Sequence, residues 1–333
     1  MDLLEQITAL FSDFANPKKR IFVGYLLLSV LIALAWLLLA RRSRLRPALR
    51  QVFDRQVFFS RSARADYKIF VINRIFTFFV SPLLLSQVAI ATAIYFALHE
   101  VHFLYPGQFG DVKPGVIVAL FTVTLFVLDD LSKYLLHRWM HHLPMLWALH
   151  KVHHSATTLT PITVYRVHPL EGVLYTLRGV VVQGSVIPLF FFLFGDAVSL
   201  YTVVGVNVLV FAFHIAGSNL RHSHISIRYW PWLEHILISP AQHQLHHSIA
   251  ARHYDKNFGA ALAIWDWMFK SLHLSPKDEE EELVFGLTPG ERSSDANLAI
   301  LYLRPLAEAL DITKQALTRR IFPASSEKQI KRD

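Results

Sequence analysis

Hydrophobic residues in this 333-residue chain gather in five long runs, separated by polar segments. A transmembrane helix needs about 20 mostly apolar residues to cross a hydrocarbon core of about 30 Å. The runs have about that length, so the pattern predicts an all-α integral membrane bundle of about four to five transmembrane helices. The runs are Ile21–Ala40, Phe76–Leu98, Gly115–Leu136, Val173–Phe194 and Val198–Ala216.

Composition supports the membrane prediction. Hydrophobic residues make up 53% of the chain and the mean hydropathy is +0.36, which is too apolar for an ordinary soluble domain. Arg41 and Arg42 follow the first run where a cleavable signal peptide would have small residues, so we expect that run to stay in the protein.

The segment after the first run is strongly basic. The positive-inside rule places such a short basic segment on the cytoplasmic side, and alternate crossings then bring the end of the third run to that side. The basic residues are Arg41, Arg42, Arg44, Arg46, Arg50, Arg55, Arg61, Arg64, Lys68 and Arg74.

The net charge of +8 does not indicate nucleic-acid binding, because the basic residues flank hydrophobic runs, as expected for contact with anionic lipid headgroups. The chain has no cysteine, which excludes disulfides. The acidic run Asp278–Glu282 is predicted to be a solvated loop, with a docking patch for a basic electron carrier as the alternative.

Three histidine clusters carry the predicted chemistry. Within each, imidazoles recur at i, i+3 or i+4 and therefore share one face of a helix. Neutral imidazole is the commonest protein metal ligand, so the spacing predicts a polynuclear metal site with nitrogen ligands. The clusters are His137-Arg-Trp-Met-His141-His142, His150-Lys-Val-His153-His154 and His243-Gln-Leu-His246-His247.

The number of donors indicates which metal is bound. A structural zinc needs four ligands, so this many clustered histidines suit two metals with open positions. Iron with open sites for O₂ fits best, and a membrane location implies a lipid substrate that enters from the bilayer. A metal transporter is disfavoured because the donors lie at one face. A zinc-dependent lipid hydrolase is disfavoured by the histidine count.

Two further residues are candidate catalytic residues. Asp130 lies in an apolar run two turns before His137, where a carboxylate is costly and suggests function. It could accept a ring N–H from a ligand histidine, pair with Lys133 or Arg138, or simply lie at the interface. His168 precedes a proline and could line the substrate pocket or donate to a ligand, with packing as the alternative.

The three clusters together resemble the fatty acid hydroxylase/sterol desaturase superfamily of membrane non-haem iron oxygenases. The similarity covers about residues 120–272 and extends to the segments His168–Glu171, Gly217–His222 and Tyr254–Gly259, which look like its bacterial members. The resemblance implies a bacterial inner membrane protein that hydroxylates or desaturates a sterol-like or fatty acyl lipid.

The resemblance also implies the ligands and partners. His222 would supply the ligand that precedes the last cluster, with His224 and then His214 as alternatives. Two iron ions, O₂ and electrons from NAD(P)H are expected, delivered by a separate cytochrome b5, ferredoxin or reductase. The expected metal ligands are His137, His141, His150, His153, His154, His222, His243, His246 and His247.

Three regions are expected. Residues 1–114 hold the N-terminal transmembrane helices and the basic loop, 115–273 form the catalytic domain of the resembled family, and 274–333 form a cytoplasmic amphipathic tail.

Overall fold

The computed structural model is all-helical, and only isolated β-bridges, such as Leu237 with Leu262, join segments of the described chain. The described residues are 12–17, 19–80, 86–195, 198, 207–276, 283–288, 291 and 297–321. The predicted acidic loop Asp278–Glu282 lies outside them.

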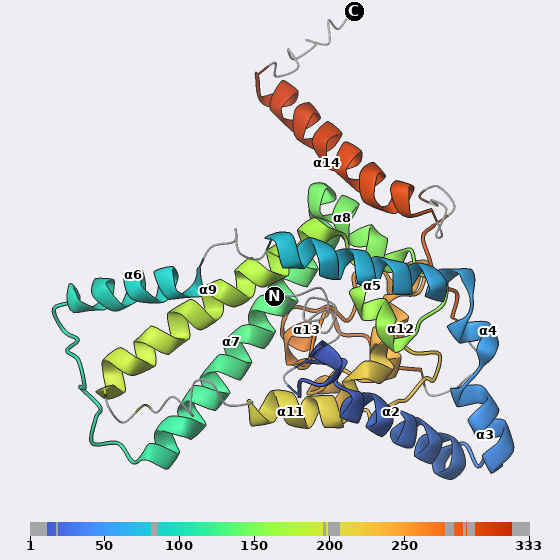
Figure 1. Cartoon of the computed structure of the whole chain (residues 1–333), viewed down its shortest axis with the longest axis horizontal. Coiled ribbons are helices and arrows are strands. Elements are labelled where there is room, and N and C mark those ends of the chain that lie inside the picture. Colours follow the sequence, from blue (N-terminus) through green and yellow to red (C-terminus); the bar gives the residue numbers. More distant parts are fainter. Residues whose placement is uncertain are drawn as a thin grey trace, which may run out of the picture.

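Figure 1 shows how the α-helices of the described chain are arranged. They are α2 (Val23–Ala35), continued by the π-helix η2 (Trp36–Ala40), α3 (Leu45–Val52), α4 (Arg55–Phe58), α5 (Arg61–Val80), α6 (Gln87–His99), α7 (Pro114–His142), α8 (Pro144–His154), α9 (Pro169–Phe194), α11 (Val208–Ile215), α12 (Pro240–His246), α13 (Ile264–Met268) and α14 (Leu298–Ile321). Short 3-10 turns join them: η1 (Ser12–Phe14), η4 (Pro161–Tyr165), η6 (Ser218–His222), η7 (Leu233–His235) and η8 (Ala251–His253).

Three helices in the described chain are long and apolar enough to span a membrane: Val23–Ala40, Pro114–His142 and Pro169–Phe194. They correspond to the first, third and fourth predicted runs. A shorter apolar helix, Gln87–His99, accompanies them. The protein is therefore a multi-pass membrane protein with a helical bundle, as the hydrophobic pattern predicts.

Two predicted runs differ from single spanning helices. Phe76–Leu98 is divided between the end of α5 and the 13-residue α6. Pro82 lies between them in the sequence, and a proline interrupts the hydrogen bonds of a helix interior. Of the fifth run, the structure describes residue 198 and the eight-residue helix α11, preceded by Asn207.

The membrane helices pack through a phenylalanine-rich contact. α7 and α9 lie along each other, and α6 lies along α9 on the side of the molecule where these three helices extend together (Figure 1). Phe121 of α7 meets Phe190 of α9 edge to face, with ring centroids 5.2 Å apart. This geometry is the one that aromatic pairs prefer, and it fixes α7 against its neighbour.

A proline starts each helix that carries the first two histidine clusters. Pro114 occupies the first turn of α7 and Pro144 the first turn of α8, where a missing N–H costs nothing. Pro144 follows the end of α7 at His142 by two residues, where a proline cannot continue the helix. The chain thereby reverses immediately after the first cluster and brings the second cluster back against it.

The last helix, α14, packs against α8. Leu301 of α14 is buried with Val152 of α8 and Ile69 of α5. Lys151 of α8 forms an ion pair with Glu308 of α14. Within the predicted C-terminal tail, the described helix α14 thus packs through its first half against α8, the helix that carries the second histidine cluster.

Candidate metal centre

Nine histidines from four helical segments converge in two adjacent groups. Within each group the possible ligand atoms all lie within 4.8 Å of one another. The five-histidine group consists of His137, His141, His150, His154 and His246. The four-histidine group consists of His153, His222, His243 and His247. The structure thus brings together all nine residues that the sequence suggested as ligands.

Imidazole rings of the two groups pack directly against each other. The rings of His154 and His247, one from each group, stack with centroids 4.6 Å apart. The ring centroid of His154 also lies 4.8 Å from that of His246, which belongs to the same group. Two ions bound in these groups would therefore be close neighbours within one centre.

Adjacent histidines in the sequence serve different groups. His153 belongs to the four-histidine group and His154 to the five-histidine group. Likewise, His246 belongs to the five-histidine group and His247 to the four-histidine group. Side chains of consecutive helix residues point about 100° apart. In a His-His pair at the end of α8 or α12, one imidazole is therefore directed toward one histidine group and the other imidazole toward the second group. The doublets therefore join the two groups.

Hydrogen bonds to the Nδ1 atoms orient the rings of the five-histidine group. Nδ1 of His137 lies 2.8 Å from the Phe258 carbonyl oxygen and Nδ1 of His246 lies 2.7 Å from that of Lys256. Nδ1 of His150 lies 2.9 Å from a carboxylate oxygen of Glu171. Because these oxygens only accept, each Nδ1 carries the proton and each Nε2 presents a lone pair to the group.

The four-histidine group converges through its Nε2 atoms. Nε2 of His222 lies 3.1 Å from Nε2 of His153 and 3.0 Å from Nε2 of His243. Nδ1 of His153 lies 3.3 Å from the Arg166 carbonyl oxygen, which orients this ring in the same way. The Nε2 atoms of His153, His222 and His243 thus converge on one position.

Several of these ring nitrogens are buried and have no hydrogen-bond partner among the described residues. In native proteins a buried polar atom normally has a partner, so such atoms indicate a ligand. Neutral imidazoles that converge in this way fit divalent metal ions. In the five-histidine group the atoms are Nε2 of His137, His141, His150, His154 and His246, and in the four-histidine group they are both ring nitrogens of His247.

Burial keeps these imidazoles neutral. Burial, and then repulsion between neighbouring imidazoles, holds the pKa of His154 and of His247 well below the ordinary value of 6.5. Burial also lowers the pKa of His246 to about 3, although the hydrogen bond to Lys256 opposes this shift. Protons therefore do not compete for these ring nitrogens at neutral pH.

A buried ion pair holds the end of α8. The side chain of Arg166, fully buried, donates to the Val152 carbonyl at 3.1 Å and to the Ser155 hydroxyl at 2.9 Å. It also pairs with Asp66 of α5 at 2.8 Å. Because the Arg166 carbonyl orients His153, this network connects α5 with the four-histidine group.

The carboxylate of Asp130 binds backbone instead of a histidine ring. It accepts from the N–H groups of Ala261 and Leu262 at 2.8 and 3.0 Å, and from Nε1 of Trp265 at 2.9 Å. Lys133, a predicted partner, pairs with Asp129 at 2.6 Å. Of the alternatives that the sequence left open, direct contact with a ligand histidine is not among the hydrogen bonds of Asp130 in the described chain; its carboxylate instead holds the backbone of the distant loop that contains Ala261 and Leu262.

That loop carries the carbonyl that orients His137. Asp266 accepts from the N–H groups of Phe258 and Gly259 at 2.8 and 2.7 Å. A Cβ at Gly259 would lie 2.7 Å from the Leu262 carbonyl oxygen, so this position requires glycine. Asp130 and Asp266 together fix the loop and, through Phe258, the ring of His137.

His168 caps a helix. Its Nδ1 accepts from the Leu170 N–H at 3.2 Å and its Nε2 donates to the Tyr302 carbonyl at 3.1 Å, so it faces neither histidine group. Three residues later, Glu171 supplies the contact to His150 that the sequence reasoning missed. A carboxylate in the first turn of an apolar helix was the available signal.

The remaining candidate histidines lie outside both groups. Nδ1 of His142 lies 2.8 Å from the Arg138 carbonyl at an exposed position. Nδ1 of His214 lies 2.8 Å from the Ser218 hydroxyl, and Nε2 of His224 lies 2.6 Å from the Gln51 carbonyl. Among the three alternatives for the additional ligand, His222 is the residue that joins a group.

A cavity of about 290 Å³ opens onto both groups. His141, His154 and His246 of the five-histidine group and His247 of the other line it, together with Trp147. Nε1 of Trp147 donates to a carboxylate oxygen of Glu291, which also lines the cavity, at 3.0 Å. A substrate in this cavity would reach both histidine groups.

The fatty acid hydroxylase family profile matches residues 122–271, the region that contains all nine histidines. This region belongs to the fatty acid hydroxylase family. The family assignment agrees with the resemblance expected from the histidine clusters.

Three curated relatives show how far the similarity extends. Human alkylglycerol monooxygenase is 28% identical over 48% of this chain and 31% of its own length. A Delta(7)-sterol 5(6)-desaturase of Gibberella zeae is 29% identical over 44% of this chain and 41% of its own. The ornithine lipid hydroxylase OlsE of Rhizobium tropici is 26% identical over 59% and 52%.

The similarity therefore spans about a third to a half of these relatives' lengths. No solved structure gives a significant match.

Proposed function

We propose that this protein is a membrane-bound non-haem diiron oxidoreductase that uses O₂ and supplied electrons to hydroxylate or desaturate a lipid. The observation that carries the proposal is the pair of buried histidine groups at the end of α7, a helix long and apolar enough to span a membrane. In this proposal each group holds one iron, and the nine histidines of the two groups are the ligands.

The similarities support an oxidative reaction on a lipid. The three relatives are named as a monooxygenase, a desaturase and a hydroxylase, and their names specify an alkylglycerol, a sterol and an ornithine lipid. Iron bound in the two groups would supply the means to activate O₂ and remove hydrogen from an unactivated C–H bond. We infer a sterol-like or fatty acyl substrate without assigning the carbon.

The chain itself positions the ligands for this chemistry. Glu171 and the carbonyls of Phe258, Lys256 and Arg166 hold the proton on Nδ1 of four histidines and direct Nε2 inward. Such partners fix ring orientation and raise ligand basicity. The burial of both groups limits access of water, so the cavity beside Trp147 is the proposed route to the metals.

The membrane side and the electron supply are also proposals. The basic segment after α2 supports a cytoplasmic location for the metal centre by the positive-inside rule, as in a bacterial inner membrane. Electrons from NAD(P)H would arrive through a separate carrier of the cytochrome b5, ferredoxin or reductase type. The region boundaries at residues 114 and 273 remain part of the same proposal.

A zinc-dependent lipid hydrolase is the second candidate, because buried histidines and a cavity would also suit metal-activated water. Nine histidines in two groups exceed the three protein ligands of a catalytic zinc site, which favours the oxidoreductase. A metal transporter fits the site less well, because the metal-binding histidines gather at one end of the bundle and do not mark a path across it.

Metal analysis and lipid profiling distinguish these functions. We expect about two irons per chain in the detergent-purified protein, and an oxygen-dependent change in one lipid class in cells that express it. Zinc alone, with lipid changes that persist without oxygen, would overturn the proposal in favour of the hydrolase.

A further inference from the structure

Two segments of the chain expose large apolar side chains outside the metal centre. Trp230 and Trp232 are 68% and 63% exposed, and their rings lie parallel with centroids 6.3 Å apart. In α13, Trp267 and Met268 are 62% and 60% exposed. A gathering of exposed apolar side chains marks a contact with a partner or a membrane. These four side chains form the indole patch.

The two segments of the indole patch are joined by backbone and ring contacts. The N–H of Ala263, immediately before α13, donates to the Ile236 carbonyl at 2.9 Å. The ring of His235 meets the ring of Trp267 edge to face, with centroids 6.4 Å apart. The segment that carries Trp230 and Trp232 therefore lies against α13, and the patch is one surface.

Contacts with α7 give the level of the patch relative to the bilayer. Nε1 of Trp265 in α13 donates to Asp130 of α7 at 2.9 Å, and Tyr134 of α7 stacks on Phe269 at the end of α13. α7 follows the charged Lys113, so its start marks one boundary of the hydrocarbon core. At about 1.5 Å per residue, Asp130 and Tyr134 lie about 24 and 30 Å along the axis from that start. The core is about 30 Å thick, so α13 lies where it gives way to the headgroups.

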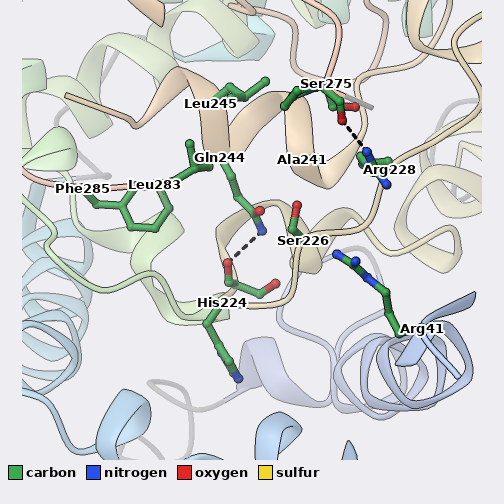
Figure 2. A pocket seen from close by; sticks show the side chains of 12 residues that line it. Arg41, His224, Ser226, Arg228, Ala241, Gln244, Leu245, Ser275, Leu283 and Phe285 are labelled. Carbon is green, nitrogen blue, oxygen red and sulfur yellow. Dashed lines mark hydrogen bonds between the residues drawn. The ribbon is translucent and has the colours of Figure 1, made fainter. Parts of the chain in front are cut away.

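The end of a second membrane helix gives the same level. Arg41 directly follows the spanning segment Val23–Ala40. It lines a cavity of about 260 Å³ together with Arg228, and Figure 2 shows both arginines on the same side of this cavity. Arg228 precedes Trp230 by two residues. The indole patch thus lies near the ends of two helices that are long and apolar enough to span the membrane.

The chemistry of the patch fits a lipid interface. Tryptophan is enriched where headgroups meet hydrocarbon, because its ring is largely apolar and its N–H is polar. In the segments 228–238 and 263–272 both carboxylates, those of Glu234 and Asp266, are buried and accept hydrogen bonds from serine hydroxyls. Lys270, beside the patch, is exposed. These segments therefore present no acidic side chain that would repel anionic headgroups, and a basic one that attracts them.

We propose that the indole patch lies in the interfacial zone of the bilayer, in the leaflet where α2 and α7 end. Its partner is the lipid surface, and the three indoles anchor α13 to it. Asp266 of α13 accepts from the Phe258 N–H, and the Phe258 carbonyl orients His137. Contact with lipid therefore braces the metal centre from the membrane side, whatever reaction the centre performs.

The chain has no cysteine, so a single spin label can report on this surface. Met268→Cys is labelled and reconstituted in vesicles of dioleoyl phosphatidylcholine. Electron paramagnetic resonance then measures collisions of the label with O₂, which concentrates in the bilayer, and with a water-soluble nickel chelate. We expect frequent collisions with O₂ and few with the chelate, as for Val118→Cys, which is exposed on the spanning helix α7. Arg64→Cys, at an exposed position of α5, is the control that faces water.

Trp230→Ser/Trp232→Ser, made in the chain labelled at Met268→Cys, tests the role of the indoles. We expect collisions with the nickel chelate to rise several-fold toward the value for Arg64→Cys, because serine does not anchor a surface at the interface. Leu303→Ser removes a side chain that is 65% exposed on α14 and should leave the collisions unchanged. An unaltered thermal unfolding midpoint in detergent verifies that each variant is folded.

Three results would overturn the proposal. Collisions of the Met268→Cys label with the nickel chelate as frequent as those of Arg64→Cys would mean that the patch faces water, where it would suit a protein partner. Few collisions with either reagent would mean that another part of the chain covers the patch. A label that stays shielded from the chelate in Trp230→Ser/Trp232→Ser would mean that the indoles are not the anchor.

Discussion

Glu171 and His150 form a hydrogen bond of 2.9 Å in which each side chain is 2% exposed. We predict that Glu171→Ala lowers the affinity of the five-histidine group for metal about 10–100-fold, because the ring of His150 loses the partner that fixes its tautomer. Glu171→Gln should lose less, since its amide oxygen still accepts the Nδ1 proton. Bound iron per chain after dialysis against a chelator measures the effect.

The matched control for this prediction is Glu100→Gln, at an exposed carboxylate beyond the end of α6. It should retain iron like the unmodified protein. If Glu171→Ala also retained iron fully, the proposed role of this carboxylate would be wrong.

Removing one ligand from either group should abolish activity. His246→Ala affects the five-histidine group and His153→Ala the four-histidine group, and both should lower bound iron while membrane insertion is unchanged. His142→Ala is the control, because this exposed histidine belongs to neither group. Metal analysis and lipid product formation are the measurements, and full activity in either ligand variant would contradict the diiron assignment.

Two neighbouring aspartates should respond differently to loss of charge. Asp130→Asn removes acceptor capacity that the N–H groups of Ala261, Leu262 and Trp265 use, so the loop that orients His137 should loosen and activity should fall. Asp129→Asn affects the contacts to Lys133 and Arg178 and should cost less activity. Equal, negligible effects on product formation would return both residues to a purely interfacial role.

The buried pair of Asp66 and Arg166 should matter for stability. Asp66→Ala leaves the Arg166 guanidinium buried without its carboxylate, which costs about 3–5 kcal/mol. We expect a lower thermal unfolding midpoint in detergent and weaker metal binding at the four-histidine group. Arg64→Gln, at an exposed position on the same helix, is the control, and a midpoint equal to that of this control would disprove the prediction.

The contact between α14 and α8 should weaken at acidic pH. Burial raises the pKa of Glu308, but the hydrogen bond and charge of Lys151, and then those of Arg304, outweigh it and lower the pKa below the ordinary 4.5. A lowered folded-state pKa means that the ion pair stabilises the structure above pH 4.5, and that this contribution is lost as the pH falls below that value. Because Glu308 is partly exposed, the effect should be modest.

Hydrogen exchange in the first half of α14 measures this change. Exchange there should increase relative to α7 as the pH is lowered, after correction for the intrinsic pH dependence of exchange. In Glu308→Gln the difference between low and neutral pH should disappear. An equal pH response in that variant would assign the effect to another group.

The sequence predicts most of the fold because hydrophobic length and prolines act locally. The runs that became α7 and α9 are long, and Pro144 separates the first two clusters regardless of tertiary context. The apolar content of Phe76–Leu98 alone does not show that this run is divided between two helices, α5 and α6. The described helices α5 and α6 lie on either side of Pro82 in the sequence, and a proline is unfavourable inside a helix.

The candidate ligands follow from helical spacing, but their division into groups does not. His153 and His154 are equivalent in the sequence, and only the placement of η6 and α12 assigns them to different groups. Contacts such as Glu171 with His150, or Asp66 with Arg166, join residues 21 and 100 positions apart. No periodicity connects such residues, so they require the tertiary structure.

A single uninterrupted helix, α7, contains both a spanning segment and His137. At about 1.5 Å per residue, His137 lies about 35 Å along the axis from Pro114. The height of His137 relative to the bilayer is thus set by a continuous helix and not by a loop. In the proposed reaction, the depth of a membrane lipid would decide which of its carbons reaches the histidine groups, so the length of α7 would select the position of oxidation.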